Sequence, residues 1–107
     1  MNKYTELSEL EINKRVAEKL GLAYEVTRYG VVTRMSNKEQ WREFNPCNNP
    51  ADAMPIIIEN KIGLSPMYHS NKWTADCLDY DFISVNKNPL RAAMELFLLM
   101  KDAENEG

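Results

Sequence analysis

The segment that follows Asn88-Pro89 constrains the fold of this chain most, because it predicts a helix that is apolar on nearly every side. We expect this helix to run to about Asp102. At about 100° per residue, its polar side chains form one narrow stripe, opposite an apolar core face. The stripe consists of Arg91, Glu95 and Asp102, and the core face of Leu90, Ala93, Phe97 and Met100. Such a helix must be buried between layers or covered by a partner.

Two leucines of this helix lie outside its predicted core face. Leu98 falls inside the polar stripe, and Leu99 lies on its flank. We therefore predict a candidate interface on this helix, used for self-association as a homodimer or for binding a host protein. Its residues are Leu98, Leu99, Arg91 and Glu95. The alternative is that loop 36–48, with Trp41 and Phe44, covers the two leucines.

Arg91 lies in the first turn of the helix, where a positive charge opposes the helix dipole unless it has a partner. Glu95 follows one turn later and supplies that partner as an i,i+4 pair. A bound anion or an acidic group across an interface is the alternative partner, and we favour the pair with Glu95.

The ends of the first helix are well marked. Ser8 and Glu11 have the spacing of a capping box, in which each side chain bonds a backbone N–H of the other. Gly21 suits the left-handed position that ends a helix. These signals predict a helix over residues 9–20.

A second helix is predicted to begin at Asn49-Pro50, since Asn caps helices well and Pro suits the first helical position. Its apolar residues Met54, Ile58 and Ile62 recur every four positions. Gly63 repeats the signal for a helix end.

Segments rich in β-branched and aromatic residues predict the strands. Residues 23–28 and 31–35 predict a hairpin that turns near Gly30, and residues 72–78 and 82–85 predict two more strands. The order α-β-β-α-β-β-α predicts an α/β protein of the α+β type. We expect a sandwich in which a mainly antiparallel, four-stranded sheet packs with three helices.

The composition is that of an ordinary globular protein, with 107 residues, 44% of them hydrophobic and 27% charged. This length predicts a single domain over residues 1–107, with an ordered core at about 5–102. Thirteen basic and sixteen acidic residues give a net charge of −3. No domain-wide basic field attracts phosphate backbones, which argues against nucleic acid as the partner.

Cysteine usage and apolar runs predict the compartment. Cys47 and Cys77 have no CxxC pair or larger disulfide framework, which indicates free thiols in a reducing compartment. Residues 1–6 lack the apolar run of a signal peptide, and the longest apolar run, residues 96–100, is too short to cross a bilayer. We therefore expect a cytoplasmic protein with no membrane partner.

Three stretches carry motifs of a known family. They are residues 44–57 (FNPCNNPADAMPII), residues 73–75 (WTA) and residues 88–94 (NPLRAAM). Together they resemble a family of small bacteriophage proteins, the phage ABA-sandwich family, and the chain is similar to NinX-like proteins. The resemblance spans roughly residues 5–100. It implies a helix–sheet–helix sandwich and a phage or prophage origin, with no established activity and no catalytic residues.

Candidate chemistry is sparse. Cys47 and His69 could act as nucleophile and base only if the fold brought them together with a third, orienting group. A zinc site would lack a fourth ligand and closely spaced pairs, and the acidic residues within 76–81 fit a solvated turn. We therefore assign no catalytic, cofactor-binding or metal-binding residue.

The sequence thus favours a phage or prophage accessory protein in the host-cell cytoplasm. We expect it to act without enzymatic activity, by binding a host protein, a phage protein or itself. One alternative is a small enzyme or ligand-binding protein that uses Cys47, His69 and the helix start at Asn49. A nucleic-acid-associated protein is the other alternative.

Overall fold

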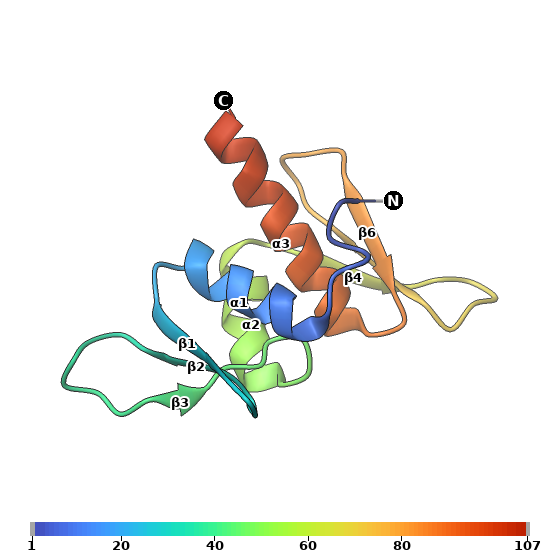
Figure 1. The fold of residues 1–107 in the computed structure, drawn as a ribbon. Coiled ribbons are helices and arrows are strands. Elements are labelled where there is room, and N and C mark those ends of the chain that lie inside the picture. The colour runs from blue at the N-terminus through green and yellow to red at the C-terminus, as the bar shows by residue number, and fades with distance from the viewer. Residues whose placement is uncertain (1, 107) are drawn as a thin grey trace.

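The chain folds into two small antiparallel sheets with helices packed between them (Figure 1). The computed structural model describes residues 2–106. The helices are α1 (Glu9–Lys19), α2 (Pro50–Glu59) and α3 (Pro89–Glu106). The strands are β1 (Ala23–Thr27), β2 (Gly30–Arg34), β3 (Arg42–Glu43), β4 (Gly63–Pro66), β5 (Trp73–Asp76) and β6 (Ile83–Asn86).

Each sheet has three strands within the described residues. Sheet A has the order β1-β2-β3 and sheet B the order β4-β5-β6, with every neighbouring pair antiparallel. The predicted hairpin at Gly30 is confirmed. The prediction of a single four-stranded sheet is wrong. Each hairpin packs on a different helix, and the unpredicted short strands β3 and β4 complete two separate sheets.

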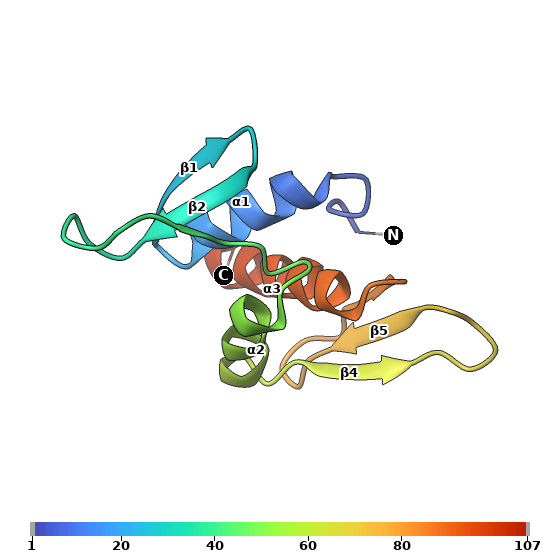
Figure 2. The ribbon, with the colours of Figure 1, turned by 90° about the horizontal axis from the view of Figure 1, so that it is seen from below.

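The elements stack in four layers, which Figure 2 shows from sheet A to sheet B. Sheet A packs on α1, α1 packs on α3, and α3 packs on all three strands of sheet B. Helix α2 lies against α3. The helices are thus inside and the sheets outside, unlike the helix–sheet–helix order implied by the family resemblance. This position explains why α3 is apolar on nearly every side.

Helix α1 follows its sequence signals closely. The N–H of Glu11 donates to Ser8 Oγ at 3.1 Å, and Gly21 has a φ of 75° after the C-cap residue Leu20. The predicted helix over 9–20 is therefore confirmed to within one residue. Ile12 and Val16 are buried against the rest of the core.

Helix α2 begins as predicted but ends early. The side chain of Asn49 caps it, and Pro50 is its first residue. It ends at Glu59, because Lys61 takes the left-handed conformation (φ 53°) that the sequence assigned to Gly63. Gly63 lies in β4 instead.

The buried face of α2 also differs from the predicted stripe. Ala53, Ile56 and Ile57 are buried, whereas Met54 and Ile58 are exposed.

Helix α3 starts at the predicted cap. The N–H of Leu90 donates to Asn88 Oδ1 at 2.9 Å. Every residue from 91 to 98 is buried. Among residues 2–106, no helix combines the length and the apolar character that crossing a membrane requires.

Candidate functional site

Three of the four side chains of the candidate interface on α3 are buried. Leu98 and Glu95 are fully buried and Arg91 is nearly so, because α1 and sheet B cover this part of the helix from two sides. These three side chains therefore form no exposed patch. Leu99 is half-buried and borders a surface groove, which is described below.

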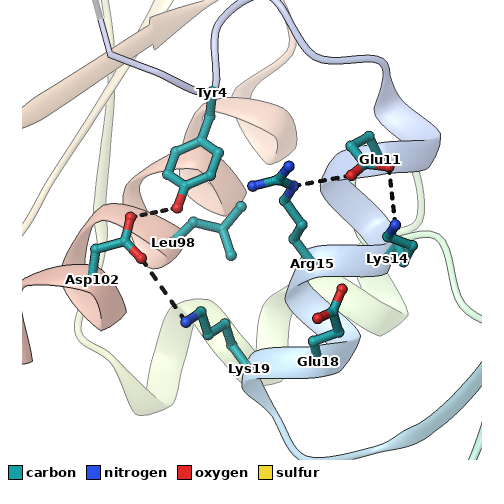
Figure 3. Close-up of a pocket in the computed structure, with 8 residues that line it drawn as sticks. All are labelled: Tyr4, Glu11, Lys14, Arg15, Glu18, Lys19, Leu98 and Asp102. Carbon is teal, nitrogen blue, oxygen red and sulfur yellow. Dashed lines mark hydrogen bonds and ion pairs between the residues drawn. The ribbon is translucent and has the colours of Figure 1, made fainter. Parts of the chain in front are cut away.

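Residues 2–7 and helix α1 cover Leu98. Leu98 lies beside Tyr4 and Arg15 at a hollow of about 340 Å³ between the N-terminal segment, α1 and α3 (Figure 3). The alternative cover was loop 36–48. Its first part, between β2 and β3, extends away from α3 (Figure 1), whereas Phe44, after β3, is buried in the core. The ring of Trp41 lies against the guanidinium of Arg34, and its centroid is 4.3 Å from Arg34 Cζ.

Arg91 and Glu95 form a buried ion pair that holds the start of the chain against α3. Arg91 Nε lies 2.8 Å from Glu95 Oε2, so the predicted i,i+4 pair is confirmed. Arg91 Nη2 also donates to three backbone carbonyls within residues 4–7, and Asn2 Nδ2 donates to Glu95 Oε1. The charged groups of Arg91 and Glu95 are therefore both bound by other parts of the same chain.

Asp102 joins three parts of the chain at the same hollow. Its carboxylate accepts a hydrogen bond from the Tyr4 hydroxyl, and lies 2.9 Å from Lys3 Nζ and 3.9 Å from Lys19 Nζ. Burial alone would raise the pKa of Asp102, but the hydrogen bonds from Lys3 and Tyr4 and the lysine charges outweigh burial and lower it. Burial, together with the bond to Asp102, raises the pKa of Tyr4.

The charged side chains that line this hollow balance in number. Three basic and three acidic side chains line it: Lys14, Arg15, Lys19, Glu11, Glu18 and Asp102. Glu11 already pairs with Lys14 at 3.4 Å and with Arg15 at 3.1 Å. Lys3, bonded to Asp102, adds a further positive charge beside the hollow. The printed contacts of these side chains join the N-terminal segment, α1 and α3.

The structure does not bring Cys47 and His69 together. Cys47 is fully buried, and burial raises the pKa of its thiol to about 12. His69 lies in the exposed loop between β4 and β5, edge-on to the ring of Tyr68, and this loop extends away from the helices (Figure 2). A nucleophile–base pair of these two residues is not formed.

The start of α2 is occupied by the chain's own side chains. Asn49 Oδ1 accepts from the N–H of Ala51 at 3.0 Å, and Asp52 Oδ2 accepts from the N–H of Asn45 at 2.9 Å. Asp52 thus places a carboxylate where the helix dipole favours negative charge. The helix start at Asn49 offers no open anion site.

The acidic residues around β5 are also dispersed. Asp76 lies close to Gly63, where an added Cβ would meet Asp76 Oδ1 at 2.5 Å. Asp79 and Asp81 are exposed in the turn before β6. In residues 2–106, no group of three or more His, Cys, Asp or Glu side chains could hold a metal ion.

A groove of about 600 Å³ lies beside β6. It is lined by the N-terminal segment, by β6 and its neighbours, and by α3: Asn2, Thr5, Lys72, Phe82, Ile83, Ser84, Val85 and Leu99. Strand β6 is one of the two outer strands of sheet B and pairs only with β5 among the described residues. Its second edge has no strand beside it, and the N-terminal segment, with Asn2 and Thr5, forms the other wall of the groove on that side (Figure 1).

The two faces of β6 differ. Ser84 lies opposite the buried Ala75, and its hydroxyl donates to the carbonyl of Ala92 in α3, so this side chain faces the core. Ile83 and Val85 alternate with it and face outward. Ile83 is 57% exposed.

The other outer strands carry residues that hinder addition of a further strand. β1 contains Glu25, β3 consists of Arg42 and Glu43, and β4 ends at Pro66. Charges and proline are the usual protection of an exposed edge, and Ile83–Asn86 contains neither. We therefore take the free edge of residues 82–86 with its groove, hereafter the β6 edge, as the candidate functional site.

Sequence reasoning placed a strand at residues 82–85 but did not recognise it as a site. The available signal is the alternation of Ile83 and Val85 with Ser84 and Asn86. That pattern would normally turn the apolar pair inward. In the structure the orientation is the opposite. Ser84 pairs with the buried Ala75 and faces the core, so Ile83 and Val85 face outward.

The fold and the site define a small α+β protein with one unprotected apolar strand edge. A family model described as bacteriophage P22, NinX matches residues 3–101. Because the match covers most of the chain, the chain belongs to this phage family, and the resemblance found in its motifs is confirmed. No curated protein matches the chain.

Proposed function

We propose that this chain is a phage accessory protein that acts by binding another protein through the β6 edge. One observation carries the proposal: β6 is an uncharged outer strand with an apolar face, and it borders a groove of about 600 Å³. Exposed apolar surface of this kind is typical of interaction sites in small proteins.

The chemistry of the β6 edge favours an extended protein segment as the ligand. An outer strand presents a row of backbone N–H and C=O groups, which an added strand can satisfy. Phe82 and Leu99 in the groove would then receive apolar side chains of that segment, which would supply specificity. Of the four residues of the interface expected from the sequence, Leu99 borders this groove.

The enzyme alternative has less support. Its nucleophile candidate, Cys47, is buried with a raised pKa, and its base candidate, His69, lies on a separate exposed loop. The third part of that hypothesis, the helix start at Asn49, is filled by Asp52.

A photo-crosslinking amino acid at position 83 tests the proposal in bacteria infected with a phage that encodes this chain. The matched control carries the same amino acid at position 58, because Ile58 is 67% exposed on α2 and does not line the groove. We expect a discrete cross-linked product from position 83 whose partner is identified by mass spectrometry, and none from position 58. The absence of a product at position 83, or equal products at both positions, would contradict binding through the β6 edge.

A further inference from the structure

The partner that best fits the β6 edge is a second copy of this chain. We propose that two copies pair antiparallel through β6, about a two-fold axis at Ser84, so that two copies of sheet B form one continuous sheet. This inference rests on the proposed function and names the partner of the same site.

The two-fold axis matches the side chains of β6 to one another. With Ser84 opposite Ser84 of the second copy, Ile83 lies opposite Val85 of the second copy, and Val85 opposite its Ile83. Both residues face outward in each copy, so two apolar cross-strand pairs form on the same side of the joined sheet. Symmetry thus makes the exposed face of β6 complementary to itself.

Charge supports the same register. Asp81 and Lys87 flank β6, and both are exposed. In the pairing centred on Ser84, Asp81 lies opposite Lys87 of the second copy at each end of the strand. An axis at residue 83 would place Asp81 opposite Val85, and an axis at residue 85 would place Lys87 opposite Ile83. Only the central register pairs charge with opposite charge.

Nothing within β6 opposes this arrangement. Ile83–Asn86 contains no charge and no proline, so two copies neither repel each other nor lack a backbone donor. The hydroxyl of Ser84 is already bonded to the Ala92 carbonyl inside the chain. In the proposed pairing, the second copy lies along the groove between β6 and the N-terminal segment, and its side chains meet Phe82 and Leu99.

Sedimentation equilibrium of the full chain tests the proposal. We expect the parent to be a dimer that dissociates on dilution, and Ile83→Lys to be a folded monomer at the same concentration. Ile58→Lys is the matched control, because it places the same charge at another exposed isoleucine, and it should remain a dimer. Circular dichroism of each variant reports whether it is folded.

A second pair of variants, which exchanges the charges at positions 81 and 87, tests the dimer if Ile83→Lys does not fold. Lys87→Asp should weaken the dimer roughly tenfold, since two attractive pairs become repulsive, and Asp81→Lys added to Lys87→Asp should restore it. A monomeric parent, or a dimer unaffected by either change, overturns pairing through β6. If the parent is monomeric but position 83 still cross-links a different protein, the proposed function stands and the second copy is excluded as the partner.

Discussion

At the scale of single residues, the polar side chains of α3 are explained by the backbone groups that they bind. A buried ion pair loses much of its attraction to desolvation unless further hydrogen bonds complete it. Arg91 meets this condition with the carbonyls of residues 4–7, and Glu95 with the amide of Asn2. The i,i+4 spacing made the pair predictable. The carbonyl partners were not, because they lie more than eighty residues away along the chain.

Cys47 is expected to be chemically inert in the folded chain. Its pKa of about 12 leaves almost no thiolate at neutral pH, and the thiolate is the reactive form. In the variant Cys77→Ser, iodoacetamide should modify no thiol in the native protein and one thiol after unfolding in urea, as counted by mass spectrometry. Fast modification of the native variant would contradict this and would revive the enzyme hypothesis.

At the scale of elements, the two Asn-Pro helix starts look alike in sequence but differ in what they hold. Asn49 caps α2 through its own first turn. Asn88 caps α3 and also donates to the carbonyl of Cys47 at 2.6 Å, which ties α3 to the segment before α2. The start of a helix is local information and was predictable, whereas this second bond is a tertiary contact.

The two caps should therefore differ in their contribution to stability. We expect Asn49→Ala to lower the free energy of unfolding by about 1 kcal/mol, the usual value of a cap. Asn88→Ala should lower it by about 2 kcal/mol, because it also leaves the Cys47 carbonyl without a donor. Urea unfolding of both variants measures the difference. Equal losses would show that the bond to Cys47 contributes nothing.

The two glycines that the sequence assigned to helix ends also differ in what surrounds them. The end of α1 at Gly21 follows from the glycine itself. Gly63 carries the same sequence signal, yet it lies in β4 opposite Asp76, whose side-chain oxygen lies 2.5 Å from where a Cβ would be. A glycine kept for close approach cannot be distinguished by sequence from one kept for a left-handed turn.

At the scale of the whole molecule, the structure shows what covers the extra apolar residues of α3. The sequence had left two possibilities open. The sequence required either a second layer or a partner, and the structure places α1 and the N-terminal segment over Leu98. The β6 edge could not be predicted, because it depends on which strands end up outermost. Strand order follows from β3 and β4, whose short segments have weak strand signals.

The contacts of Asp102 with Lys3, Tyr4 and Lys19 should make stability depend on pH. The pKa of Asp102 is lower in the folded chain than the unfolded value of about 4, so its ionised form favours folding above that pH. That contribution is lost as the pH falls through the folded pKa. We expect Asp102→Asn to be less stable than the parent by about 1 kcal/mol at pH 7, with the gap narrowing as the pH falls below about 4.

Urea unfolding of the parent and of Asp102→Asn at a series of pH values measures this gap. Glu104→Gln is a suitable control, because Glu104 lies on the same helix, is exposed, and pairs only with the nearby Lys101 among the contacts described. A gap for Asp102→Asn that stays constant down to pH 3 would contradict the role of the carboxylate.

The contacts between residues 2–7 and α3 also determine when this chain can fold. They join residues 84 to 98 positions apart, so residues 2–7 can complete their packing only after α3 has been synthesised. Long-range contacts of this kind slow folding, because a large loop must close before they form. At ribosomal rates, residues 50–106 take roughly several seconds to synthesise. During that time α1 lacks the packing partner that α3 provides, so the apolar face of α1 is open to chaperones and proteases until α3 has been synthesised.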